Sequence, residues 1–120
     1  MLFRVDPASP VPLGDQVAAC VRGAVSEGSV RAGERLPAAS QVAESLGINM
    51  HTVLRGYQQL RDEGLIELRR GRGAVVTQEA SPGRTRLHSH ARGLVTEARG
   101  LGMSDDDVLA LVRASLASFR

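Results

Sequence analysis

Apolar side chains recur every three or four residues in the first part of the chain, as at Leu13, Val17 and Val21. This spacing predicts an amphipathic helix over about residues 13–27, with one face buried in a hydrophobic core. Gly28 follows this run directly. Because glycine easily adopts the left-handed conformation that ends many helices, we expect the helix to end there.

The next part of the chain predicts two more helices. Residues 38–46 have helical apolar spacing and are followed by Gly47. Asn49 is a good N-cap for a third helix that runs to Glu63, because its side chain can accept a hydrogen bond from a free backbone N–H. Gly64 then ends this helix. Two short helices joined by a glycine-containing turn are typical of a helix-turn-helix.

The pattern then changes from helical to strand-like. Residues 65–69 and 74–77 are short runs that favour β-strands. Between them, residues 70–73 have the sequence Arg-Gly-Arg-Gly, in which glycine permits the positive φ of a hairpin loop. We therefore predict a two-stranded wing with a basic tip.

Two further helical patterns occupy the C-terminal part. The polar residues 78–84 precede them and include Ser81-Pro82-Gly83, where we expect a hinge. Gly102 separates the two helices, and Ser104 with Asp107 forms a capping box that starts the second one. Their apolar stripes consist of Leu87, Ala91, Leu94, Ala98, Leu101, Val108, Leu109, Val112, Leu116 and Phe119.

These stripes leave the C-terminal helix pair with apolar surface and little to cover it. The pair spans about 35 residues, below the roughly 40 at which an unassisted domain becomes stable. Packing against the same pair in a second copy would give a two-fold dimer with an isologous interface. Docking back onto the first helix is the competing arrangement, and the sequence does not decide between them.

Composition excludes several classes of protein. All 15 basic residues are arginine, so no lysine is available for a Schiff base or a phosphate loop. A single cysteine excludes a disulfide framework and any zinc site with two thiolates. The longest apolar run is far shorter than the roughly twenty residues of a membrane span, and the N-terminus lacks a secretory signal. We expect a cytoplasmic protein that has no cofactor or metal and is not an enzyme.

The net charge of +2 is small, but its distribution is uneven. Between residues 64 and 92, six arginines stand against two glutamates, a local surplus of +4. Basic residues on a glycine-rich hairpin beside a helix-turn-helix suit phosphate contacts, because each neutralised phosphate releases condensed counterions. Double-stranded DNA is therefore the predicted partner, although a solvated hairpin would explain the loop taken alone.

Several motifs in a fixed order resemble one family. They are Leu36-Pro37, residues 46–57, the turn at residues 63–66 and the loop at residues 70–73. Over about residues 10–76 the chain resembles the GntR-type winged-helix transcription regulators, and the short two-helix tail resembles their YtrA-like subfamily. The resemblance implies a dimeric bacterial regulator that binds a palindromic operator, usually as a repressor and often of transporter operons.

The resemblance also assigns DNA contacts. It places the start of the third helix in the major groove, where Thr52 and Arg55 match the family pattern, and it places Gly71 close to the minor groove. Many relatives carry arginines where this chain has Ser40 and Met50, so the operator sequence does not follow from the resemblance. The candidate DNA-binding residues are Arg35, Ala38, Ser40, Asn49, Met50, His51, Thr52, Arg55, Arg70, Gly71, Arg72 and Gly73.

The predicted fold class is α+β. Residues 8–78 are expected to form a winged helix-turn-helix of three helices and a two-stranded wing, and residues 79–120 a linker and a two-helix dimerisation tail. The predicted function is sequence-specific DNA binding as a homodimer. A protein-interaction module that no longer binds DNA is the alternative, motivated only by the missing arginines at positions 40 and 50. An effector, if one exists, is not identified by the sequence.

Overall fold

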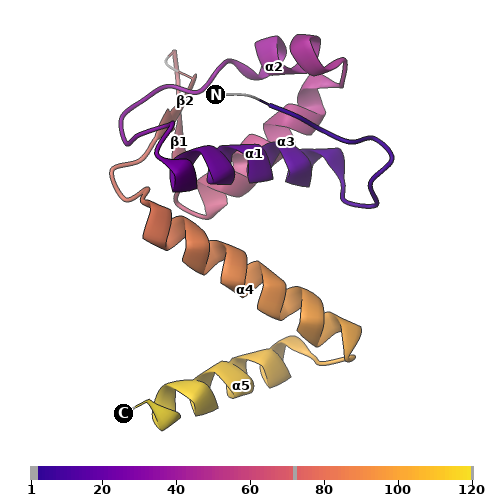
Figure 1. The fold of residues 1–120 in the computed structure, drawn as a ribbon, viewed down its shortest axis with the longest axis vertical. Coiled ribbons are helices and arrows are strands. Elements are labelled where there is room, and N and C mark those ends of the chain that lie inside the picture. The colour runs from indigo at the N-terminus through magenta and orange to yellow at the C-terminus, as the bar shows by residue number, and fades with distance from the viewer. Residues whose placement is uncertain (1–2, 72, 120) are drawn as a thin grey trace. The chain divides into compact units, whose positions relative to one another are not determined.

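The computed structural model describes residues 3–71 and 73–119, and it divides into two compact units, Met1–Arg86 and Leu87–Arg120. Over the described residues, the fold has five helices and one two-stranded antiparallel sheet (Figure 1). The first unit contains α1 (Leu13–Glu27), α2 (Ala39–Leu46), α3 (Met50–Asp62), β1 (Ile66–Arg69) and β2 (Gly73–Val76). The remaining helices are α4 (Pro82–Gly100) and α5 (Asp105–Ser118). This order confirms the predicted α+β class, a winged helix-turn-helix followed by two helices.

The first helix has the bounds that the apolar spacing predicts. Val17, Val21 and Val25 are buried along one face of α1. The helix ends at Gly28, whose φ of 78° is left-handed and whose N–H donates to the Val25 carbonyl at 3.1 Å. Glycine pays no Cβ penalty in this conformation, so the chain turns sharply away from α1 at this point.

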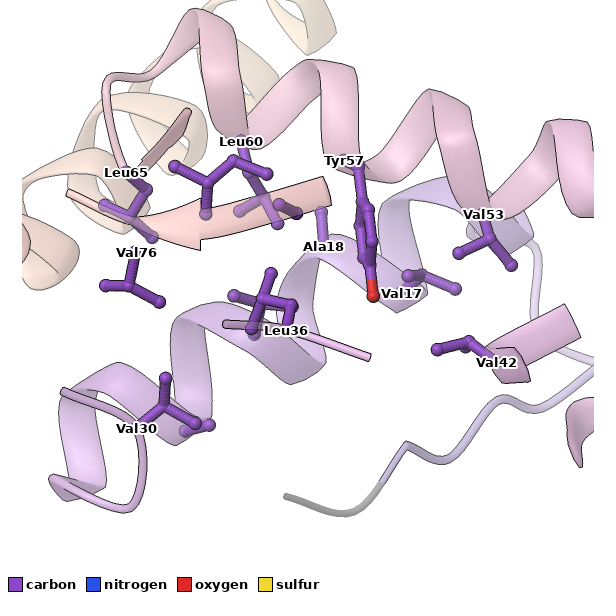
Figure 2. Packing of buried hydrophobic residues seen from close by; sticks show 14 of the residues in the cluster. Val17, Ala18, Val30, Leu36, Val42, Val53, Tyr57, Leu60, Leu65 and Val76 are labelled. Carbon is purple, nitrogen blue, oxygen red and sulfur yellow. The ribbon is translucent and has the colours of Figure 1, made fainter. Parts of the chain in front are cut away.

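One hydrophobic cluster unites α1, α2, α3 and the sheet (Figure 2). The ring of Tyr57 extends from α3 into this cluster, and its hydroxyl donates a hydrogen bond to the Pro37 carbonyl at 2.7 Å. Burial raises the pKa of the Tyr57 hydroxyl above its ordinary value, so the group stays protonated and remains a donor. The hydrogen bond ties α3 to the segment that leads into α2.

Two contacts hold α3 against α1. A Cβ atom on Gly56 would lie 2.6 Å from the Gly14 carbonyl oxygen, so the two helix backbones touch at this crossing. Towards the other end of α3, Arg22 Nε donates to Glu63 Oε2 at 2.9 Å, and Nη2 of the same arginine donates to the second carboxylate oxygen. The side chains of this ion pair are only 8% and 13% exposed. The first helix therefore supports the third at two separate points.

The segment before α2 pairs with the wing. The Leu36 N–H donates to the Ala74 carbonyl at 2.8 Å, and the Val76 N–H donates to the Glu34 carbonyl at 2.8 Å. This pairing gives the segment before α2 a short extended stretch. It places β2 between this segment and β1, so the wing is joined by backbone hydrogen bonds to the start of the helix-turn-helix.

The predicted hinge at residues 81–83 is wrong. Pro82 is the first residue of α4, and Thr85 is buried, with its hydroxyl donating to the Ser81 carbonyl at 2.7 Å. Proline is favoured in the first turn of a helix because its missing N–H would have no partner there and its φ is already helical. The proline that indicates a hinge in the sequence therefore starts a helix.

The predicted capping box of α5 is confirmed. Ser104 Oγ accepts a hydrogen bond from the Asp107 N–H at 3.1 Å, and Asp107 Oδ2 accepts one from the Ser104 N–H at 3.1 Å. No residue within α5 itself is buried. The second unit therefore leaves most apolar side chains of its last helix exposed.

Candidate nucleic-acid interface

The start of α3 is fixed by its cap. Asn49 Oδ1 accepts a hydrogen bond from the His51 N–H at 2.8 Å, which confirms the predicted N-cap. Asn49, Met50 and His51 are all exposed. The first turn of this helix therefore presents a short row of polar and apolar side chains to solvent.

The side of α3 that faces away from the core carries polar residues. His51, Arg55 and Gln58 are exposed and lie four and three residues apart, so they share one face of the helix. Thr52 is half-buried, on the flank that adjoins α1. Sequence reasoning missed Gln58, although the same helical spacing that selected the buried residues would have placed it beside Arg55.

Two grooves flank α3 and bring several candidates together. A groove of about 220 Å³ lies between the start of α1 and α3, and Thr52 and Arg55 line it together. A groove of about 460 Å³ lies between the start of α2, α3 and the hairpin, and it is lined by Ala38, Arg70 and Gly73 among others. The start of α2, the third helix α3 and the hairpin all carry candidate DNA contacts, and they adjoin one another in the fold.

The tip of the wing is basic and narrow. Arg70 is exposed, and Gly71 beside it has a φ of 78° and no side chain. Arg69 Nη2 lies 2.8 Å from Glu67 Oε2, so the charge of this arginine is partly neutralised on the strand. Arg72 lies outside the described residues. Among the described residues of the wing tip, Arg70 is therefore an exposed cation that is suited to contact a phosphate.

The remaining candidates lie before α3. Arg35 is exposed, and its backbone pairs with Val75 of the wing. Ala38 is the N-cap residue of α2, and Ser40 is exposed in the first turn of that helix. Arg35 and Ser40 are exposed but line neither of the two grooves. The structure therefore places Arg35 and Ser40 outside the two grooves that bring the other candidates together.

Other kinds of site find no support in the part of the chain that the structure describes. Among residues 3–71 and 73–119, no group of three or more His, Cys, Asp or Glu side chains could hold a metal ion. None of the helices over the same residues is both long enough and apolar enough to span a bilayer.

The predicted dimerisation residues are mostly accessible. The exposed members are Leu87, Ala91, Leu101, Leu109, Val112, Leu116 and Phe119, while Leu94 and Val108 are half-buried. Ala98 differs from the other predicted residues, because only 3% of it is exposed and its own chain covers it. A small side chain on the inner side of a helix is easily covered in this way.

The second unit contains an apolar groove. Its volume is about 420 Å³, and it is lined by Leu94, Leu111, Val112, Ser115, Leu116 and Phe119. Leu111 is exposed and was missed by the sequence stripe. Five of the six lining residues are apolar, so the groove favours an apolar occupant.

Comparison with known proteins agrees with this architecture. The family model described as "Bacterial regulatory proteins, gntR family" matches residues 13–76. The chain is similar to the HTH-type transcriptional repressor YtrA of Bacillus subtilis, with 30% identity over 79 residues that cover 66% of this chain and 61% of that protein. It is also similar to the HTH-type transcriptional regulator Rv1152 of Mycobacterium tuberculosis, with 32% identity over 107 residues that cover 89% of this chain and 88% of that protein. The chain thus spans less than two thirds of the first relative and most of the second.

A solved structure extends the similarity to the C-terminal helices. The structure of YtrA from Sulfolobus acidocaldarius, a GntR-family transcription factor, is similar with a TM-score of 0.60 and 28% identity. The alignment covers 96% of this chain and 97% of that chain, so it includes both the winged helix and the two helices that follow.

Proposed function

The chain belongs to the GntR family of bacterial regulatory proteins, which are DNA-binding transcription regulators and not enzymes, and from this premise we propose that it is a homodimeric repressor of a palindromic operator. Its relative from Bacillus subtilis is named a transcriptional repressor, which supports repression as the mode of control. Repression would follow from occlusion of a promoter, with a transporter operon as the expected target and the cytoplasm as the place of action.

The uncovered apolar face of α5 is the main support for the homodimer. Leu109 and Leu116 are each 53% exposed, and Phe119 at the end of the helix is 93% exposed. Burying apolar surface stabilises by about 25 cal/mol per Å², so a face of this kind favours association. A second copy offers an identical face, and a two-fold axis would let each copy cover the other. In this proposal residues 8–78 bind DNA and residues 79–120 dimerise.

The exposed face of α3 is proposed to enter the major groove. Thr52 and Arg55 would contact base edges or phosphates there, since hydroxyl and guanidinium groups are common donors to both. Arg70 and Arg72 would follow the phosphates that border the adjacent minor groove, and Gly71 would allow the backbone to approach it. The double-stranded DNA partner would thus be held by α3 and the wing of each subunit.

Selection of bound sequences from a pool of random duplexes tests this proposal. We expect an enriched palindrome with half-sites about 10 bp apart or a small multiple of this spacing, because each subunit of a dimer binds one half-site. Affinity for the enriched duplex should fall steeply as salt rises. Thr52→Ala or Arg55→Ala should weaken binding by about 1–3 kcal/mol. A protein that enriches no sequence and shows no salt-dependent DNA binding would instead be a protein-interaction module.

A further inference from the structure

Gln58 lies on α3 but has no role in the DNA contacts of the proposed function. It is exposed and lies seven residues after His51 and three after Arg55. Residues at these spacings lie on one face of a helix, here the face opposite the buried side of α3. From His51 to Gln58 the helix rises by about 10 Å, which is the length of about three base pairs. Gln58 is therefore within the stretch that a major groove can accommodate.

The side chain of Gln58 is chemically free to recognise a base. Within the described residues, it takes part in no hydrogen bond, so both its amide N–H donors and its carbonyl acceptor are available. A glutamine amide can donate to N7 and accept from the N6 amino group of the same adenine. Leu54 lies four residues before Gln58 and lines the groove of about 460 Å³ between the start of α2, α3 and the hairpin. Its side chain offers an apolar surface suited to a thymine methyl group.

The next exposed residue on this face sets a limit to the contact region. Asp62 follows Gln58 by one turn, and its side chain is 72% exposed. Its charge would repel phosphates, and Arg61, whose Nη2 lies 3.4 Å from Asp62 Oδ1, is on the same helix. The polar face that is compatible with DNA therefore ends at Gln58.

We propose that Gln58 is a specificity-determining residue that recognises an adenine in each half-site of the operator. This inference rests on the proposed function, because it requires α3 to lie in the major groove. It assigns base recognition to the second and third turns of the helix, in a chain that has Met50 and Ser40 at positions where arginine would offer a bidentate contact to guanine.

The test compares base preferences of four full-length proteins by selection from the same pool of random duplexes. They are the wild type, Gln58→Ala, Gln58→Glu and the control Gln78→Ala. Gln78 is an exposed glutamine that follows β2 (Gly73–Val76), at the end of the hairpin away from the wing tip, and it lines neither of the grooves beside α3. Circular dichroism and thermal unfolding of each variant verify that the exposed substitutions leave the fold intact.

We expect Gln58→Ala to lose a preference for adenine at one symmetric pair of positions, by about 5- to 150-fold. Gln58→Glu should shift that preference towards cytosine, because a carboxylate accepts from the cytosine amino group. Gln78→Ala should keep the wild-type preferences. A uniform loss of affinity for all sequences, or unchanged preferences in both Gln58 variants, would overturn the proposal. If the wild type itself enriches no sequence, the proposed function fails, which is a separate and distinguishable result.

Discussion

At the crossing of α1 and α3, the position of a single glycine decides how closely two helices pack. A side chain at Gly56 would meet the Gly14 carbonyl oxygen and two atoms of Val17. The first of these is a backbone atom, which cannot rotate away as a flexible side chain can. Since Thr52 and Arg55 flank Gly56 on the same helix, a shift of this crossing would also move the candidate DNA contacts.

Gly56→Ala is therefore expected to lower the free energy of unfolding by about 1–3 kcal/mol, because the added methyl group forces the two helices apart. Denaturant unfolding measures this change. Gly23→Ala on α1 is the matched control, since a Cβ there meets no atom within 4 Å. Alanine has the higher helix propensity, so this control should raise stability by about 0.5–1 kcal/mol. A Gly56 variant as stable as the wild type would refute the close contact.

The buried ion pair gives a second expectation for single residues. Arg22→Met leaves the Glu63 carboxylate without its charged partner in a nearly buried site, which costs about 3–5 kcal/mol. Replacing both residues by apolar side chains of similar size should cost much less, because no lone charge then remains buried. A double-mutant cycle measured by denaturant unfolding checks this. A double variant that loses as much stability as the two single variants added together would show that the two side chains act independently.

At the scale of elements, the wing tip is expected to contribute charge and not sequence preference. Arg70→Ala should weaken binding to all duplexes and reduce the slope of log affinity against log salt by about one unit. Arg72→Ala should act in the same way if its side chain also reaches a phosphate. Titrations of one duplex at several salt concentrations measure the slope.

Arg31→Ala provides the control for the wing. Arg31 is exposed and lies in the turn near Gly33, whose N–H donates to the Val76 carbonyl at the end of β2 away from the tip. Its removal lowers the net charge by the same amount, yet we expect the salt slope to stay unchanged. If both variants reduce the slope equally, the tip has no special contact with phosphates.

The elements show how far local sequence signals can predict this fold. The bounds of α1 follow from apolar spacing and a terminal glycine, and the start of α3 follows from Asn49, because these signals act within one turn of the chain. The start of α4 does not, because Ser81-Pro82-Gly83 is compatible with both a turn and a first helical turn. Burial of Thr85 resolves this, and burial is a property of the assembled unit.

The candidate site was partly predictable for the same reason. Motif positions placed Thr52 and Arg55 on α3, but their shared groove depends on the packing of α1, which no local pattern contains. Gln58 needed only the helical spacing and was overlooked because it belongs to no motif. Ala98 was assigned to a partner surface because the stripe cannot distinguish a side chain covered by its own chain from one left exposed.

At the scale of the whole molecule, removal of the C-terminal unit is expected to separate DNA binding from dimerisation. The truncation should end at Arg86, because Thr85 is buried and belongs to the first unit. Residues 1–86 should keep the helical circular-dichroism signal of the winged helix, sediment as a monomer and bind the operator much more weakly. A truncated chain that still sediments as a dimer would contradict the proposed role of the tail.

Point substitutions in the full-length chain provide an independent check. Leu116→Glu places a charge in the apolar groove of the second unit, so it should shift sedimentation towards the monomer. Ala110→Glu on the other side of α5 adds the same charge at an exposed position and should leave the dimer intact. Dissociation by both variants would indicate a general effect of charge on this helix.

The uncovered face of α5 has a consequence for how a gene would respond to this protein. When most copies are monomers, the amount of dimer rises with the square of the total concentration, so operator occupancy changes more steeply than the protein level. By linkage, the proposed operator would also draw monomers together, because in this proposal only the paired form binds both half-sites. Dimerisation through α5, a helix with no buried residue, would therefore let the protein occupy the promoter only above a threshold concentration.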